Sequence, residues 1–331
     1  MRNLGIVISA DYFPLKQIID IIPLVEKQGY NQISVPEMWG HDIVTQLTII
    51  ALKTKKIHFS SGIINMFSRS PGLVAMTSAT LQELSEGRFI LGLGLSGPKV
   101  VENLHGKNFD KPLKRTKEFV QIVKTLLNNE RLHFPDSTYG KLIDFKLSFK
   151  NKYSTKIHIA ALGPKNMKLA AKIADGWIPV LMPLEAFRQQ VDTMHKHLKN
   201  YGKQKDDFDI TPFVLALKGD NKKTITLLKN HLAYYFGGMG NFYNNMLSRM
   251  GYEEIANEIR ILWAKGNRKE AAEAIPLELL EDTCIMGTQK KMKEKLQDYY
   301  EAGATTPLVS LPFGTNIDKA IETIKILSPK Q

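Results

Sequence analysis

Short apolar segments alternate along the chain with longer segments in which apolar residues recur every three or four positions. The short segments are rich in Ile, Val, Leu and Phe, as buried strands are, and the longer segments have the spacing of amphipathic helices. Strands are predicted at residues 4–9, 31–36, 57–64, 89–95, 157–162, 177–180, 210–217 and 306–311. Helices are predicted at residues 14–28, 42–53, 71–85, 113–127, 164–174 and 184–200, from about 222, and at 317–326.

This alternation predicts one fold class for the whole chain. Parallel strands need helical crossovers between them and are buried on both faces, so eight strand–helix pairs favour a (β/α)8 TIM barrel. Residues 132–153 are polar and aromatic and predict a short β excursion after strand four, whereas 236–281 predict a helical insertion after strand seven. Residues 1–331 are therefore expected to form a single domain, with a doubly wound open sheet as the alternative.

Residues typical of helix caps and helix ends support these boundaries. Asp42 is expected to cap the second helix, and Gly29 and Gly87 are expected to end the first and the third.

Charge and composition narrow the class of partner. The 331 residues carry a formal net charge of +12. Such a charge suits a polyanionic partner or cofactor, or a lysine-rich solvated surface. The lysines are spread along the chain without basic runs or interleaved aromatic residues, so no nucleic-acid partner is expected.

The cysteine and histidine content argues against disulfides and metals. Cys284 is the one cysteine, which excludes an intrachain disulfide and a cysteine-rich metal site. The eight histidines lack metal-ligand spacing, and no metal is predicted. The N-terminal apolar run is too short for a signal peptide, and no apolar stretch approaches the roughly 20 residues that span a bilayer. A cytoplasmic protein without a membrane partner is expected.

Two carboxylates follow adjacent predicted strands. Asp11 comes after the first strand and Glu37 after the second. The active site of a (β/α)8 barrel lies at the carboxyl ends of its strands, so both can face one cavity and act as general acid or base. The alternative is structural, with Asp11 as a turn residue and Glu37 as an ion-pair partner.

A second candidate feature is the turn Gly163, Pro164, Lys165 and Asn166, which opens a helix directly after strand five. Free backbone N–H groups and the positive end of the helix dipole can hold a phosphate there, although an ordinary β-to-α turn has the same composition.

Glycines also occur inside two predicted strands. Gly92, Gly94 and Gly97 have the loose spacing of a dinucleotide loop, but the first two lie within strand four and no helix is expected to open directly after Gly97. Gly62 falls where strand three should end, which predicts a bulge that presses backbone against a flat ring.

Several blocks of the sequence go beyond these generic features. They lie at residues 34–42, 62–71, 79–94, 100–106, 160–166, 174–177 and 303–312, in the same order as in one family. In these blocks the chain resembles the luciferase-like flavin and deazaflavin enzymes. Its nearest resemblance there is to the coenzyme F420-dependent oxidoreductases that include methylenetetrahydromethanopterin reductase.

The resemblance implies a site at the carboxyl ends of the strands. It implies a non-prolyl cis peptide at Gly62–Ile63 behind the cofactor ring, a phosphate-binding turn at residues 163–166, and acidic active-site positions at Asp11 and Glu37. It also implies that Asn65 touches the ring edge. The full set of expected cofactor contacts is Gly62, Ile63, Asn65, Gly94, Ser96, Gly163, Pro164, Lys165, Asn166 and Trp177.

The implied activity is hydride transfer between C5 of F420 and an organic substrate, and a tetrahydromethanopterin-type one-carbon carrier is the best single candidate. Tyr234, Tyr235, Phe236, Phe242 and Tyr243 of the insertion could line a pocket for an aromatic ring or form plain core. An FMN-dependent monooxygenase and a catalytically silent cofactor-binding barrel are the alternatives. Family resemblance further implies a homodimer.

One departure concerns the related glucose-6-phosphate dehydrogenases, whose catalytic histidine corresponds to Met38 here. A methionine cannot transfer a proton, so sugar oxidation by their mechanism is not expected.

Overall fold

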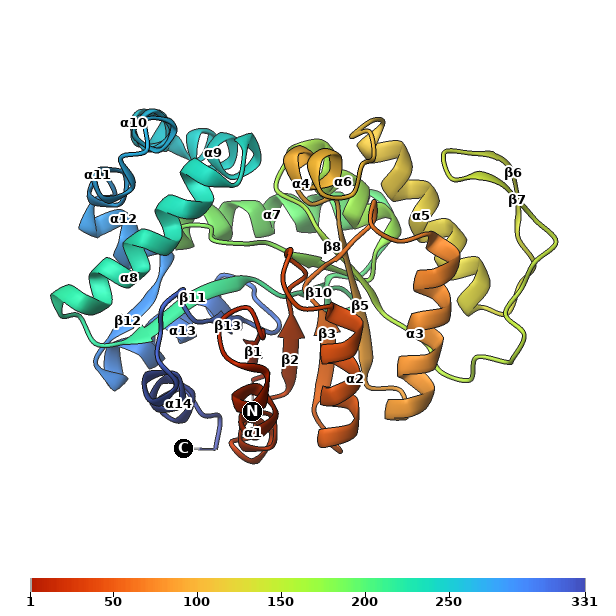
Figure 1. Cartoon of the computed structure of the whole chain (residues 1–331), viewed down its shortest axis with the longest axis horizontal. Helices are drawn as coiled ribbons and strands as arrows, with labels where there is room; N and C mark the ends of the chain where they lie inside the picture. The colour runs from red at the N-terminus through yellow and green to blue at the C-terminus, as the bar shows by residue number, and fades with distance from the viewer. Residues whose placement is uncertain (1, 331) are drawn as a thin grey trace.

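The computed structural model describes residues 2–330, and it shows a curled, mostly parallel sheet surrounded by helices (Figure 1). The strands of the sheet are β1 Gly5–Val7, β2 Gln32–Val35, β3 His58–Ser61, β4 Ile64–Asn65, β5 Phe89–Gly94, β8 Ile157–Ala160, β9 Gly176–Ile178, β10 Asp209–Ile210, β11 Phe213–Lys218, β12 Ile285–Gly287 and β13 Leu308–Ser310. The helices that follow its strands are α1 Leu15–Lys27, α2 Ile43–Lys53, α3 Pro71–Ser85, α5 Pro112–Leu127, α6 Pro164–Ile173, α7 Leu184–Asn200, α8 Lys222–Ala233, α13 Gln289–Glu301 and α14 Ile317–Ile326.

The strand pairing brings the two ends of the chain together. β13 pairs in parallel with β1 on one side and with β11 on the other. β9 pairs with β10, and a parallel bridge between Val180 and Phe213 continues this pairing to β11. β10 and β11 are consecutive, separated by Thr211 and Pro212, and together take the seventh position. This curled arrangement fits a TIM-type barrel and differs from an open doubly wound sheet.

The predicted helix boundaries are confirmed where capping residues indicated them. Asp42 caps α2, since its Oδ2 accepts the backbone N–H of Thr45 at 2.8 Å. Gly29 and Gly87 follow the first and third helices with φ of 85° and 89°, a region that glycine enters without steric cost.

Strand three is interrupted after Ser61 and resumes as β4, and the cis peptide between Gly62 and Ile63 that the resemblance implied is present. Other elements differ from the sequence-based expectations. A short helix, α4 Pro98–Asn103, opens directly after Gly97, so the expectation of no helix there was wrong. The short strand β12 and the helix α13 that follows it were not predicted.

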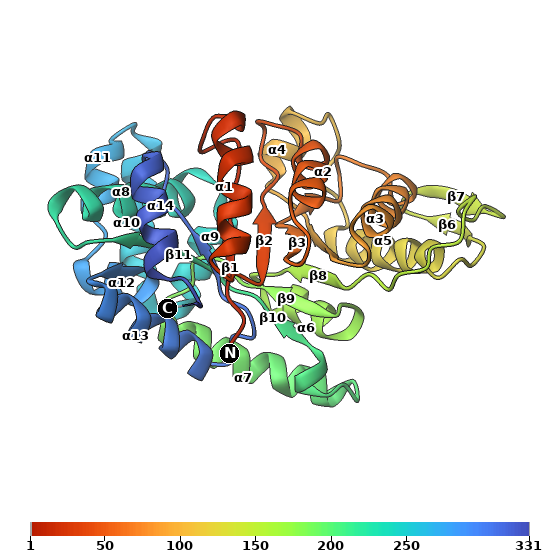
Figure 2. The same ribbon diagram turned by 90° about the horizontal axis from the view of Figure 1, so that it is seen from below.

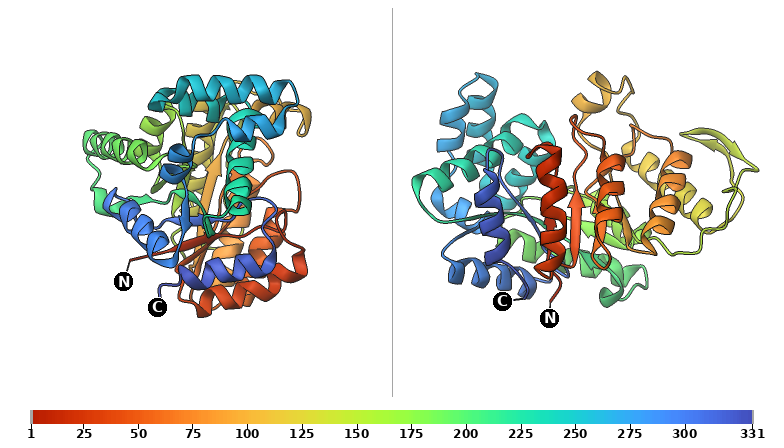
Figure 3. Two further views of the ribbon diagram at one scale, coloured as in Figure 1. Left: turned by 90° about the vertical axis from the view of Figure 1, so that its left-hand side faces the viewer. Right: turned by 60° about the horizontal axis from the view of Figure 1, so that its bottom comes forward.

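Two segments lie outside the regular alternation. After β5 and α5 the chain forms an antiparallel hairpin of β6 His133–Ser137 and β7 Gly140–Ile143. Figures 2 and 3 show this hairpin on the side of the molecule away from α8. After α8 come a π-helical turn at Tyr234–Gly238, α9 Asn241–Leu247, a second π-helical turn at Ser248–Tyr252, α10 Glu253–Ala264, α11 Arg268–Glu273 and α12 Leu277–Thr283.

The interior of the sheet contains a small apolar cluster. It consists of Val7, Ile178, Phe213 and Leu308, and Ile63 packs against it. The main core lies between the sheet and the helices. Among residues 2–330, no helix is both long and apolar enough to span a membrane.

Candidate functional site at the carboxyl ends of the strands

Asp11 lies in the loop after β1 and is held by its neighbours. Ser9 Oγ donates to Asp11 Oδ2 at 3.2 Å, and the backbone N–H of His41 donates to Asp11 Oδ1 at 3.0 Å. His41 Nδ1 lies 3.5 Å from the same oxygen. The Asp11 side chain is only 13% exposed, so most of its carboxylate faces protein groups.

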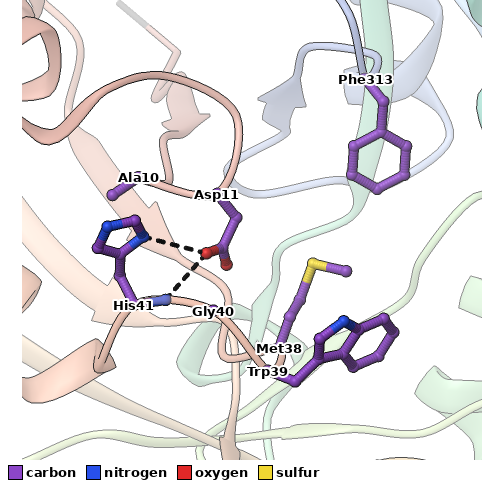
Figure 4. A pocket seen from close by; sticks show the side chains of 7 residues that line it. All are labelled: Ala10, Asp11, Met38, Trp39, Gly40, His41 and Phe313. Atoms are coloured by element: carbon purple, nitrogen blue, oxygen red, sulfur yellow. Dashed lines mark hydrogen bonds and ion pairs between the residues drawn. The ribbon is translucent and has the colours of Figure 1, made fainter.

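Asp11 lines an open cavity, hereafter the Asp11 cavity. Its volume is about 520 Å³. Figure 4 shows the His41 ring beside the Asp11 carboxylate, with Met38, Trp39 and Phe313 on the other side. The lining residues are Ala10, Asp11, Met38, Trp39, Gly40, His41 and Phe313. These residues follow β1, β2 and β13, so the cavity lies where the barrel rule places an active site.

Glu37 has a different environment. It forms an ion pair with Arg69 Nη1, and its Oε2 accepts the backbone N–H of Asn65 at 2.9 Å. Arg69 Nη2 also binds Asp42 Oδ1 at 2.9 Å. Glu37 is not among the residues that line the Asp11 cavity. The structure thus shows the ion-pair arrangement that was the alternative at this position, and it ties Glu37 to the segment that carries Asn65.

Gly94 at the end of β5 and Gly62 after β3 make room for side chains of neighbouring strand segments. A Cβ on Gly94 would lie 2.7 Å from Cγ1 of Ile63, and a Cβ on Gly62 would lie 2.3 Å from Ser34 Oγ and 2.5 Å from the Phe213 ring. Glycine is therefore required at both positions for this close packing. Ile63 is partly exposed above the interior apolar cluster.

Asn65 has an incompletely satisfied side chain. Its Oδ1 accepts the backbone N–H of Phe67 at 2.9 Å, but its Nδ2 is buried without a partner, and the residue is 2% exposed. A buried donor without an acceptor is costly, so such a group calls for an explanation, such as an acceptor on a ligand that binds there. Asn65 follows the cis peptide, where the resemblance implied a cofactor contact.

The turn at residues 163–166 opens α6 as expected. Gly163 is the N-cap, and a Cβ there would meet no atom within 4 Å. Pro164 and Lys165 are exposed, and Asn166 Oδ1 is buried without a partner. Arg249, from the second π-helical turn, donates from Nη2 to the Leu162 carbonyl at 3.0 Å. Sequence analysis missed this arginine, which adds a second cation beside the turn.

Two other expected contacts have distinct surroundings. Ser96 lies directly after β5, is partly exposed and has φ of 57°. Trp177 is fully buried, stacks on Phe187 of α7 and donates from Nε1 to the Ala161 carbonyl at 2.8 Å. Its indole therefore faces the helix layer and supports the segment before the Gly163 turn from behind. Direct contact with a cofactor, as expected for Trp177, does not fit this burial.

The aromatic residues of the insertion separate into core and surface. Phe236 is fully buried, whereas Phe242 is exposed. Tyr235 contacts Tyr243 edge-on, and Tyr234 contacts Phe313 and Trp263 edge-on. Tyr234 also lines a second cavity of about 360 Å³, hereafter the aromatic cavity. Its lining residues are Met38, Asn230, His231, Tyr234, Trp263 and Phe313.

The buried polar groups beside the aromatic cavity are neutral near pH 7. Burial lowers the pKa of His231 to about 3 and raises the pKa of Tyr243 to about 12. Burial also raises the pKa of Tyr12, and the charge of Asp11 adds to this effect. His231 Nδ1 accepts the backbone N–H of Phe313 at 3.2 Å, so the proton of the neutral ring is on Nε2. The two cavities share Met38 and Phe313, and together they offer the Asp11 carboxylate, two imidazoles and a neutral aromatic wall.

Comparison with known proteins shows which family the chain belongs to. A protein named as a coenzyme F420-dependent oxidoreductase of Mycobacterium tuberculosis is 30% identical over 90% of this chain and 91% of its own length. The 5,10-methylenetetrahydromethanopterin reductase of Archaeoglobus fulgidus is 29% identical over 93% of this chain and 94% of its own.

A solved structure shares the fold over almost the whole chain. The coenzyme F420-dependent tetrahydromethanopterin reductase from Methanopyrus kandleri superposes with a TM-score of 0.80 at 23% identity, covering 99% of this chain and 97% of that one. The family model described as luciferase-like monooxygenase matches residues 3–306. The chain therefore belongs to the luciferase-like monooxygenase family.

Proposed function

We propose that this protein is an F420-dependent oxidoreductase that reduces or oxidises a tetrahydromethanopterin-type one-carbon carrier. The proposal rests on the unpaired amide of Asn65, which lies at the carboxyl ends of the strands in a chain whose relatives include F420-dependent enzymes. A deazaflavin ring is flat and has carbonyl oxygens along one edge, so an unpaired N–H donor beside a glycine-lined segment suits it.

The residues present fit the ring. Gly62, Ile63 and Gly94 would support one face of it, because the two glycines let the strand segments approach closely and leave Ile63 partly exposed. Asn65 Nδ2 would donate to a ring oxygen and so satisfy the one partner it lacks. Glu37 would act on Asn65 indirectly, since it fixes that residue's backbone N–H.

The charged part of the cofactor also has a candidate binding surface in this chain. The free N–H groups at the start of α6, with Lys165 and Arg249 beside them, would hold a phosphate. The net charge of +12 would favour the acidic tail that F420 carries and FMN lacks. Ser96 would border this region from the end of β5.

When bound, F420 would supply the hydride through its C5 position, and the chain's own residues would position the substrate and control its protons. Asp11 is suited to a proton or charge role, since its carboxylate lines a cavity and has no Arg or Lys ion-pair partner among the described residues. Glu37 is suited to positioning, because its carboxylate is bound by Arg69 and Asn65.

The aromatic cavity supports the substrate class. Its wall of Tyr234, Trp263 and Phe313 would stack on a planar heteroaromatic ring, and Nε2–H of neutral His231 would donate a single hydrogen bond. A pterin carries such a ring. The one-carbon group would then lie towards Met38 and the Asp11 cavity, which adjoins the aromatic cavity.

Turnover with the proposed pair tests this function. Reduced F420 mixed with the purified protein and 5,10-methylenetetrahydromethanopterin should be oxidised at a rate that saturates in the pterin. The Phe313→Ala variant should raise KM for the pterin more than it lowers kcat, because Phe313 lines both cavities. Oxidation of reduced F420 by other acceptors but not by the pterin would contradict the proposed substrate, while the proposed cofactor would still stand.

We further propose that a second copy of the chain is the protein partner. Large apolar side chains are exposed on the neighbouring helices α2 and α3, namely Leu52 (66% exposed), Met76 (54%), Leu73 and Leu84. Apolar residues gathered on adjacent elements are typical of an interface between subunits.

A further inference from the structure

We propose that His41 is the proton-transfer residue of this site and that Asp11 orients its imidazole. The inference rests on the proposed function, because the reaction it serves is the hydride transfer described above. Asp11 and His41 are the two titratable residues that line the Asp11 cavity.

The loops that carry the two residues are tied together by one buried side chain. Gln46 of α2 is 3% exposed, and its Oε1 accepts the backbone N–H of Ala10 at 2.8 Å. Its Nε2 donates to the His41 carbonyl at 3.2 Å. The Gln46 amide thus fixes both Ala10, the residue before Asp11, and the backbone of His41. It therefore holds the two loops at a fixed position relative to each other.

Gly40 permits the close approach. A Cβ at this position would lie 1.8 Å from Asp11 Oδ1, so any other residue would push the carboxylate away. With glycine there, Asp11 Oδ1 reaches the backbone N–H of His41 at 3.0 Å and lies 3.5 Å from its Nδ1 (Figure 4). The second distance is at the upper limit for a hydrogen bond, and such catalytic contacts are often long without ligand.

This arrangement selects one tautomer of the imidazole. An aspartate beside Nδ1 favours a proton on that nitrogen, so Nε2 becomes the atom that gains and loses the transferred proton. The His41 side chain is 53% exposed, which lets Nε2 exchange protons with water between turnovers. The Asp11 side chain is only 13% exposed and is held by Ser9 and the His41 backbone, which suits it to the orienting role.

Neighbouring residues cannot take this role. Met38, which lines the same cavity, has no exchangeable side-chain proton. Glu37 already accepts from Arg69 and from the backbone of Asn65. His41 lies three residues beyond Met38 on the same loop and lines the same cavity.

The proposed step is a simple proton transfer. As the methylene carbon of the carrier would accept a hydride supplied by the bound reduced cofactor, its bond to one of its two nitrogens would break, and that nitrogen would keep the electron pair and take one proton from Nε2 of protonated His41. The imidazole becomes neutral and keeps its Nδ1 proton towards Asp11, and water later restores the proton on Nε2. One hydride and one proton together complete the two-electron reduction.

Two variants test the role in turnover. The His41→Gln variant should lower kcat by on the order of 100-fold, the usual contribution of general acid catalysis, while leaving the affinity for F420 unchanged. Added imidazole should restore part of the activity of His41→Ala. His133→Gln, on the distant hairpin strand β6, is the matched control and should behave like the wild type.

A measurement without turnover tests the dyad itself. In ¹⁵N spectra of histidine-labelled protein at a pH where the ring is neutral, His41 should have its proton on Nδ1, and this preference should weaken in Asp11→Asn. Full activity in His41→Gln, or a proton on Nε2 of neutral His41 in the wild type, would overturn the proposal. If F420 supported no turnover at all, the proposed function would fail, and the spectra would still decide whether the dyad exists.

Discussion

At the residue scale, Asn65 gives the most specific test of cofactor binding. Asn65→Asp keeps an oxygen for the Phe67 N–H but removes the unpaired donor Nδ2 and places charge beside the ring oxygens. We expect the affinity for F420 to fall about tenfold, the worth of one hydrogen bond of roughly 1.4 kcal/mol, as measured by fluorescence titration.

A matched exchange elsewhere serves as its control. Asn316 caps α14 by accepting the Lys319 N–H, a role that aspartate performs equally well. Asn316→Asp should therefore leave both cofactor affinity and thermal stability unchanged. Equal F420 affinity in Asn65→Asp and the wild type would show that the buried amide serves no ligand.

Gly40 is the residue whose substitution should separate binding from chemistry. In Gly40→Ala the added methyl group would displace the Asp11 carboxylate, because its Cβ would lie 1.8 Å from Oδ1. We expect turnover to fall on the order of 100-fold, as for other small misplacements of catalytic groups, with F420 affinity retained. Steady-state kinetics and a cofactor titration on the same sample measure both.

Gly72 provides the control for that substitution. It lies in α3, and a Cβ there would meet no atom within 4 Å. Gly72→Ala should keep full activity and raise the free energy of unfolding by up to about 1 kcal/mol, since alanine favours the helix. An active Gly40→Ala enzyme would mean that Asp11 need not lie against the His41 backbone.

Sequence reasoning at this scale found residues but not their partners. Asp11 and Glu37 could be selected because each follows a strand, but the Glu37–Arg69 pair joins positions 32 apart and has no local pattern. His41 satisfied the same after-strand rule and was passed over. The burial of Trp177 depends on which face of β9 it occupies, and three residues of alternating pattern could not show that.

At the scale of elements, an ionic cluster on β8 and β10 should make stability depend on pH. Asp209 accepts from Lys156 Nζ at 2.7 Å and lies 3.0 Å from His158 Nε2. Burial opposes ionisation of Asp209, but these two partners outweigh it and lower its pKa to about 2.

The sign of the effect follows from that lowered pKa. Asp209 in the unfolded chain has a pKa near 3.9, so its stabilising contribution is complete above that value and is lost as the pH falls towards 2. We expect Asp209→Asn to lower the free energy of unfolding on the order of 2 kcal/mol at pH 6 and much less at pH 2.5. Urea denaturation at the two pH values measures this, and an equal loss at both would contradict it.

Element prediction succeeded where apolar runs were long. The eight predicted strand positions and most of the helices that follow them were recovered because each strand is buried and each of these helices has one apolar face, whereas α13 was not predicted. α4 was missed because its six residues are too few to show a helical repeat of apolar positions. β12 was missed because its three residues are too few to show the alternation of a strand. The break of strand three was anticipated through Gly62 and the family resemblance.

At the scale of the whole molecule, the exposed apolar side chains of α2 and α3 should hold two copies together. We expect Met76→Glu to shift the protein from dimer to monomer in sedimentation velocity, because a charge would be buried in the interface. Leu277→Glu, on the exposed surface of α12, is the control and should leave the dimer intact. A monomeric wild type, or a dimeric Met76→Glu variant, would contradict this interface.

The overall fold was the most predictable property, because alternation over the whole chain restricts connectivity to few arrangements. The site was less predictable, since it combines loops after β1, β2 and β13 with a helical segment around Tyr234 and Arg249. Contacts such as Arg249 to Leu162 span 87 positions, and sequence pattern alone does not carry them.

A cofactor titration tests directly whether this protein uses F420. Purified protein freed of cofactor is titrated with F420 and, separately, with FMN, and binding is followed by fluorescence quenching. We expect the protein to bind F420 with a dissociation constant in the micromolar range or lower, which is typical of enzyme ligands, and to bind FMN much more weakly. Preference for FMN would contradict this expectation in favour of a monooxygenase, and binding of neither would favour a barrel without redox activity.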